Sequence, residues 1–280
     1  MSSGSSIHFR ILEDIARDLS GDINFPTCLD AAILVRNALK DPFASTEQVV
    51  QAISVEPLIS SKLLRLANSV VYNPSGDEVS NLNAVVKRLG FDIVRTTSLA
   101  VAMDQMLRSR NLAAYDHISR QTWEHSLQVA AIARVLARNL GRVQPENAML
   151  TGLVHNIGIF YLLFRAAEYP EYRNNEPAMI ELLAGWHEGI GESLLHILGL
   201  PAAITDAVRD QSHLSRVEKP CTISDILYFA IALSDNSLPW QRNLVDAEEE
   251  ARREADRVRY ADLLKSAEED IIELRGALSA

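Results

Sequence analysis

The feature that most constrains the fold of this 280-residue chain is a helical spacing of apolar residues that recurs along most of its length. Residues 31–39 place Ile33, Leu34 and Ala38 on one face, and residues 58–67 repeat the pattern with Leu63 and Leu64. No segment shows the alternation of apolar and polar residues, bounded by hairpin turns, that predicts a half-buried strand. The sequence therefore predicts an all-α protein.

Local signals place the ends of several helices. Ser45-Thr46-Glu47 is a helix start, and Pro145 suits a helix first turn. Gly90 and Gly141 are expected to end helices in the left-handed conformation that glycine adopts readily. The glycine-rich segment 181–201 predicts two helices with a joint between them.

Changes in composition suggest the organisation of the chain. Residues 1–6 are interpreted as a flexible leader, and the polar stretch 108–117 marks a boundary. We expect an N-terminal helical lobe over 7–110, a helical bundle over 111–240 and a charged helix over 241–280.

The charged C-terminal segment interleaves both signs around a thin apolar stripe. The stripe consists of Ala247, Ala251, Ala255, Val258 and Leu264. Such a helix either lies solvated against the body of the protein or pairs two copies into a homodimer.

The charge balance bears on partners. With 27 basic and 37 acidic residues, the net charge is −10, which opposes broad attraction to nucleic acid or to anionic lipid. No charged-then-apolar leader and no apolar run of about 20 residues is apparent, so we expect no membrane span and a cytoplasmic protein. Cys28 and Cys221 are expected to be buried, reduced thiols.

A set of residues on three predicted helices could hold a metal ion. His125, the pair His155–Asn156, and Asp235 could meet inside a bundle, and this donor set suits iron, manganese, zinc or nickel. His187 and His213 could extend the site to a second metal. The spacing alone is weakly specific, because a histidine in a helix is more often a core or surface residue.

Residues 84–100 have the helix–glycine–helix outline of a DNA-binding motif. Lys87, Arg88 and Arg95 would be its phosphate contacts. The second helix continues into apolar residues at 99–103, which is typical of core, so nucleic-acid binding is not favoured.

The sequence resembles the HDOD domains, which are all-helical bacterial signalling modules related to the HD phosphohydrolases. The resemblance is carried by LKDPFASTEQVVQAISVEPLISSKLLRLANSVVY, LNAVVKRLGFDIVR, WEHSLQVAAIARVLA, LTGLVHNIGIFYLL, WHEGIGESLLHILGLP and IALSDN. It spans about residues 25–236, and NSVVY and AVVKRLG are its most specific parts.

The resemblance implies roles for the candidate residues. In HD hydrolases a first His, a His-Asp pair and a distant Asp hold the metal, and these match His125, His155 and Asp235. Asn156 stands where the Asp is expected, and apolar Ile159 stands where a Lys commonly meets phosphate. An amide supplies no negative charge to a cation, so the altered motif argues against phosphodiester cleavage.

An alternative use of the segment 155–158 is structural. Asn156 would hydrogen-bond a backbone carbonyl, Gly158 would take a left-handed conformation, and His155 would pack below Trp123 or Tyr161.

Two functions follow as expectations. The first is a non-catalytic signalling module that binds a protein partner or a small ligand, such as the output part of a response regulator, with no cofactor. The second is a metal-dependent phosphohydrolase with an altered site that retains a single divalent metal.

Overall fold

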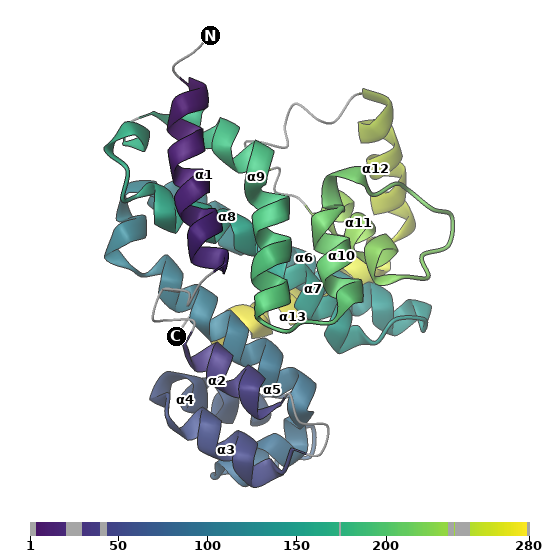
Figure 1. Cartoon of the computed structure of the whole chain (residues 1–280). Helices are drawn as coiled ribbons and strands as arrows, with labels where there is room; N and C mark the ends of the chain where they lie inside the picture. The colour runs from purple at the N-terminus through teal and green to yellow at the C-terminus, as the bar shows by residue number, and fades with distance from the viewer. Residues whose placement is uncertain are drawn as a thin grey trace. The chain divides into compact units, whose positions relative to one another are not determined.

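In a computed structural model of the chain, described over residues 4–20, 30–39, 44–173, 175–234, 238 and 247–278, every regular element is a helix. The prediction of an all-α protein is confirmed. The chain divides into two compact units, one of residues 1–24 and 107–271 and the other of residues 25–106 and 272–280 (Figure 1).

The smaller unit contains four helices of the N-terminal half. They are α2 (Asp30–Ala38), α3 (Thr46–Ser54), α4 (Pro57–Ala67) and α5 (Leu82–Leu107, whose last residue falls in the larger unit). Ser45 caps α3, its hydroxyl accepting from the Gln48 amide while the Gln48 side chain accepts from the Ser45 N–H. The expected break at Gly90 appears as a kink in α5, with φ of 78°.

The larger unit contains the remaining helices. They are α1 (Gly4–Ser20), η2 (Arg110–Tyr115), α6 (Asp116–Leu140), α7 (Pro145–Val154), α8 (Ile157–Ala166), η3 (Pro170–Tyr172), α9 (Glu176–Ile197), α10 (Ala202–Arg209), η4 (Gln211–His213), α11 (Ile223–Leu233), α12 (Ala247–Arg259) and α13 (Ala261–Leu278, whose end falls in the smaller unit). α6 and α7 form its most extensive helix pair, and α9 lies between α8 and α10.

The first helix packs with this larger unit. α1 begins at Gly4, inside the expected leader, and its Ile11 and Ile15 are fully buried. Asp18 pairs with Arg165 of α8, and the Tyr172 hydroxyl contacts His8 at 2.8 Å. Residues 8–20, which the sequence grouped with the N-terminal lobe, thus contribute to the larger unit.

The glycine-rich segment forms one continuous helix, so the predicted helix pair over 181–201 is wrong. α9 runs unbroken through Gly185, Gly189 and Gly191 to Ile197. Here glycine serves close packing rather than a turn, because a neighbouring helix approaches α9 near Gly191.

The charged C-terminal segment forms two helices, α12 and α13, and α12 packs with an unexpected face. Asp256 is 3% exposed and the Tyr260 ring packs edge-on against Phe229 of α11, whereas Val258 is 72% exposed. On α13, Asp270 is buried and lies 3.6 Å from Arg134 of α6. Ion pairs, the Tyr260 ring, the hydrogen bond from Tyr228 to Glu249 and the buried Ala267 hold this segment in place, while Ala251, Ala255 and Val258 of the predicted stripe face outward.

One stretch is long and apolar enough to cross a membrane by length and composition, which the sequence reasoning missed. It spans Pro145–Ala166, and 89% of its apolar window is buried inside the protein. The stretch consists of α7 and α8, divided at residues 155–156, and it forms core of the larger unit.

Candidate functional site

The site is built where α6 and α7 approach each other closely. A Cβ atom added at Gly152 would lie 2.7 Å from the Ala130 backbone, so only glycine allows this spacing. The close packing brings His125 of α6 beside His155, the residue that ends α7. Their rings lie edge to face with centroids 5.4 Å apart, and both side chains are buried.

The hydrogen bonds of His155 determine its tautomer. His155 Nδ1 lies 2.6 Å from the Gly152 carbonyl oxygen, which can only accept, so Nδ1 carries the proton. The lone pair is then on Nε2, and the Asn156 side-chain amide donates to it at 2.8 Å. The same amide group also donates to Ser126 Oγ at 3.3 Å, and both His155 and Asn156 are 0% exposed.

Burial keeps His155 neutral. Loss of hydration, with smaller contributions from the neighbouring His125 and His187, lowers the pKa of His155 from 6.5 to about 3. A neutral imidazole that accepts through Nε2 is therefore the form present at physiological pH.

His187 of α9 reaches the same region because α8 and α9 touch. A Cβ atom added at Gly158 would lie 2.0 Å from the His187 carbonyl oxygen, so the first turn of α8 rests on the backbone of α9. The His187 Nδ1–H donates to the Leu183 carbonyl at 2.7 Å, and burial lowers the pKa of His187.

The remaining candidates differ in their placement. Asp235 and Cys28 lie outside the described residues. His213 is exposed on η4, and Cys221 is a half-buried free thiol that accepts from Arg142 at 3.0 Å, rather than a buried one. His125 Nδ1 contacts the Ser234 hydroxyl at 3.4 Å.

The structural interpretation of residues 155–158 is wrong in two details. The Asn156 amide bonds His155 and Ser126 rather than a backbone carbonyl. Gly158 has a helical rather than a left-handed backbone conformation. Glycine is required there because its missing side chain allows the close contact with α9.

The described residues do not fit a divalent metal ion. No group of three His, Cys, Asp or Glu side chains among them could hold one. The His155 lone pair, which would bind the ion, already accepts a hydrogen bond from the Asn156 side-chain amide. The Asn156 Oδ1 atom is buried with no hydrogen-bond partner in the described part of the chain, and as a neutral amide oxygen it supplies no negative charge to a cation.

A cavity of about 600 Å³ with both apolar and polar walls opens beside His187. Its described walls come from α9, α11, α12 and the loop after η4, and they include Gln211, Arg216, Arg252 and Arg253. The sequence reasoning missed these residues, because arginines in a loop and in a highly charged helix carry no motif.

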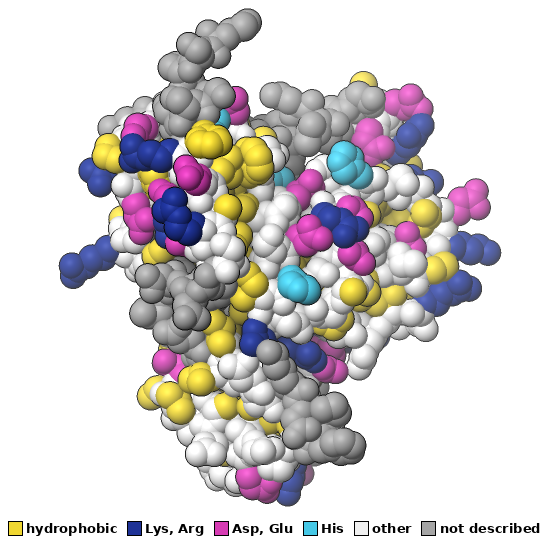
Figure 2. Space-filling model, in the orientation of Figure 1, with side chains coloured by type: hydrophobic (Ala, Val, Ile, Leu, Met, Phe, Trp, Pro, Cys, Tyr) yellow, Lys and Arg dark blue, Asp and Glu magenta, His cyan; other side chains and the backbone are white. Residues whose placement is uncertain are grey.

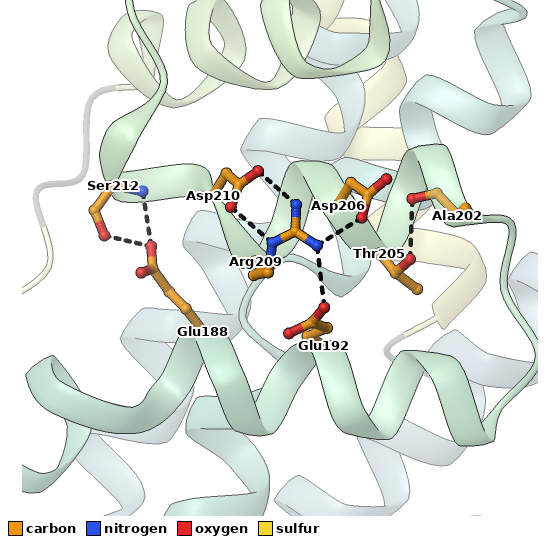
Figure 3. A network of polar contacts seen from close by, with 8 residues as sticks. All are labelled: Glu188, Glu192, Ala202, Thr205, Asp206, Arg209, Asp210 and Ser212. Carbon is orange, nitrogen blue, oxygen red and sulfur yellow. Dashed lines mark hydrogen bonds and ion pairs between the residues drawn. The ribbon is translucent and has the colours of Figure 1, made fainter.

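A polar network holds one wall of this cavity (Figure 3). Glu188 of α9 accepts from both the N–H and the hydroxyl of Ser212 in η4. Arg209 of α10 binds Glu192, Asp206 and Asp210, which fastens α10 to α9. The Gln211 side chain donates to the His155 carbonyl at 3.1 Å, so the cavity wall is bonded directly to the histidine site.

A second groove, of about 870 Å³, runs between α1 and α9. Hydrophobic side chains follow it on the face drawn in Figure 2, and its described lining includes Leu12, Leu19, Ile190 and Trp186, which is 48% exposed.

A family model for the HDOD domain matches residues 25–214. The chain belongs to the HDOD domain family. The resemblance noted in the sequence is thereby confirmed. No curated protein matches the chain.

Solved structures share the fold of this HDOD chain. A protein of Shewanella amazonensis SB2B, provisionally named a metal-dependent phosphohydrolase, aligns with a TM-score of 0.72 at 22% identity, over 97% of this chain and 98% of that one. A provisionally named signal transduction protein of Marinobacter aquaeolei VT8 aligns with a TM-score of 0.60 at 18% identity, over 98% and 66%. An HDOD domain protein of unknown function from Geobacter sulfurreducens aligns with a TM-score of 0.57 at 19% identity, over 94% and 99%.

Proposed function

We propose that this HDOD chain is a non-catalytic signal-transduction module of the cytoplasm. It acts by binding a protein partner or a small ligand, as the output part of a response-regulator system does. The observation that carries the proposal is the hydrogen bond from the Asn156 amide to His155 Nε2. That bond uses the electron pair with which an HD hydrolase histidine would hold its metal.

The chemistry of the pair explains why asparagine suits a metal-free core. An aspartate carboxylate at the same place would direct a negative oxygen at the His155 lone pair, and only a cation or a proton between them would relieve the repulsion. The neutral amide removes that requirement. The Asn156 amide and the His155 lone pair are thus held together by their own hydrogen bond.

A second departure supports the same function. Ile159, which stands where related hydrolases carry a phosphate-binding lysine, is fully buried in α8. An apolar side chain inside the core neither pairs with phosphate nor protonates a leaving group.

Nucleic acid is not favoured as a partner, because Leu99–Met103 of the DNA-binding candidate are buried and Arg88 donates to the Ala67 and Asp77 carbonyls.

The test is to restore the acidic residue. Purified parent, Asn156→Asp and His155→Ala proteins are compared for metal content by inductively coupled plasma mass spectrometry and for cleavage of bis(p-nitrophenyl) phosphate with added manganese. We expect no stoichiometric metal and no cleavage in the parent, and metal uptake in Asn156→Asp, because its carboxylate supplies the missing charge.

Cleavage by the parent that disappears in His155→Ala would overturn the proposal and establish the alternative, a phosphohydrolase with an altered motif. Stoichiometric metal in the parent that is lost in His155→Ala would contradict the role assigned to Asn156.

A further inference from the structure

Two residues that line the cavity beside His187 each have an acceptor atom without a partner among the described residues. Because His187 Nδ1–H donates to Leu183, Nε2 carries the lone pair, and it has no partner among the residues that the structure describes. Gln211 uses its amide N–H on the His155 carbonyl, and its Oε1 atom is buried without a partner in the same set of residues. Both atoms call for a ligand that donates hydrogen bonds.

Three arginines line the same cavity. Arg216 binds Asp256 through Nε and Nη2 at 2.8 Å each, and Arg253 contacts Glu249 through Nε alone. Among the described residues, the Nη1 group of Arg216 and both terminal nitrogens of Arg253 have no further acceptor, whereas the terminal nitrogens of Arg252 pair with Glu248 and Glu249. Arg216 and Arg252 also line an adjoining hollow of about 480 Å³, so they stand at the boundary between the two spaces.

The acidic residues of the lining are turned to partners of their own. Glu188 accepts twice from Ser212. Glu249 accepts from the Tyr228 hydroxyl at 2.8 Å, and burial together with Glu249 raises the pKa of Tyr228 to about 12, so this hydroxyl stays protonated. The cavity thus combines guanidinium donors with carboxylates that are already engaged, in a chain whose total charge is −10.

We propose that this cavity binds a small organic anion that carries hydroxyl groups, either a phosphate or a carboxylate. Its charged group lies between Arg253 of α12 and Arg216 of the loop, and its hydroxyls donate to His187 and Gln211. The inference rests on the proposed function, because it names the small ligand that a non-catalytic module would bind. The three arginines lie beyond residues 25–214, the part matched by the family model, whereas His187 and Gln211 lie within it.

The test measures binding to the full chain by isothermal titration calorimetry with four probes. Ribose 5-phosphate and gluconate are the hydroxyl-bearing phosphate and carboxylate, while ribose and inorganic phosphate each lack one half of the proposed ligand. We expect saturable binding of at least one of the first two and weaker binding of the last two. The stronger of the first two probes identifies which anionic group the site prefers.

Two variants and one matched control locate the binding. Arg253→Gln removes a donor from the cavity, and Ser215→Asp adds a negative charge at an exposed lining residue, where folding is little affected. Each should weaken binding about tenfold, the value of one charge-assisted hydrogen bond. Arg257→Gln is the control, because Arg257 lies on the same helix with similar exposure, 26% against 24%, and pairs with Glu250 and Glu254 outside the described cavity lining.

The outcomes separate this inference from the proposed function. If neither hydroxyl-bearing anion binds, or if both cavity variants bind as the parent does, the anion site is overturned while the non-catalytic module stands. Inorganic phosphate is assayed in the same samples after titration. Release of phosphate from ribose 5-phosphate would instead overturn the non-catalytic function and leave the binding site in place.

Discussion

At the residue scale, the site depends on Asn156. Its side-chain amide donates a hydrogen bond where the aspartate of an HD hydrolase would only accept one. The Asn156 amide faces an imidazole lone pair, and the geometry of the Gly152 contact leaves His155 no other tautomer. The pair is fully buried, so each of its hydrogen bonds counts more than it would at the surface.

The lowered pKa of His155 predicts a loss of stability in acid. Its folded pKa of about 3 lies below the ordinary 6.5, so the unfolded chain takes up the proton first as the pH falls. The contribution of neutral His155 to the unfolding free energy is fully present above pH 6.5. It decreases by about 1.4 kcal/mol for each pH unit as the pH falls from 6.5 towards 3.

Urea unfolding at roughly pH 7, 6 and 5 measures this slope. His155→Gln should unfold with a shallower pH dependence than the parent, whereas the exposed His196→Gln should match the parent. Equal slopes in parent and His155→Gln would mean that His155 takes up its second proton over the same pH range in the folded and the unfolded chain.

At the scale of the elements, glycines determine which helices can touch. Gly158 allows α8 to rest on the backbone of α9 at His187, and Gly152 allows α7 to rest on α6. Both contacts bring histidines from separate helices to one point, so the helix spacing builds the site.

Gly158→Ala should therefore destabilise the protein. The new methyl group would lie 2.0 Å from the His187 carbonyl oxygen, so α8 and α9 must separate. We expect a loss of about 1–3 kcal/mol in unfolding free energy, the usual result of overpacking a core, measured by urea denaturation.

Gly189→Ala provides the control on the neighbouring helix, since no atom lies within 4 Å of its added Cβ. It should stabilise α9 by about 0.5–1 kcal/mol through the lower backbone entropy of the unfolded chain. If Gly158→Ala left the unfolding free energy unchanged, α8 and α9 would be able to separate without loss of stability, which would contradict this prediction.

At the scale of the whole molecule, the outward face of α12 bears on the proposal of a homodimer. Val258, Ala251 and Ala255 are exposed, because α12 uses Asp256 and Tyr260 to hold the bundle. This face is the surface through which we propose that two copies pair.

Light scattering tests the pairing directly. The 31.0 kDa chain should show about twice that molar mass in the parent, and Val258→Lys should return it to the monomer by placing two like charges in the interface. A monomeric parent at all protein concentrations would rule out this homodimer.

Several features followed from the sequence because they depend on neighbouring residues. The helix start at Ser45 and the break at Gly90 are local events, and the helical period of the chain follows from the 3.6-residue repeat. The family match from residue 25 was carried by contiguous motifs, and the altered residues Asn156 and Ile159 were visible in a single segment.

Other features were decided only by the tertiary structure, because they join residues far apart in the chain. Glycines in 181–201 predict a joint when they are considered locally, yet α9 continues through them because α8 packs close to its backbone. The apolar stripe of α12 predicts the face that packs on the protein. Instead, Asp256 forms an ion pair with Arg216, forty positions away, so the opposite face of the helix packs and the stripe is exposed. The sequence by itself determined a helical HDOD chain with an altered motif. The folded chain decided that the Asn156 amide is buried against Ser126, and that arginines from a loop and a later helix line one cavity with His187, since only three-dimensional contact brings these groups together.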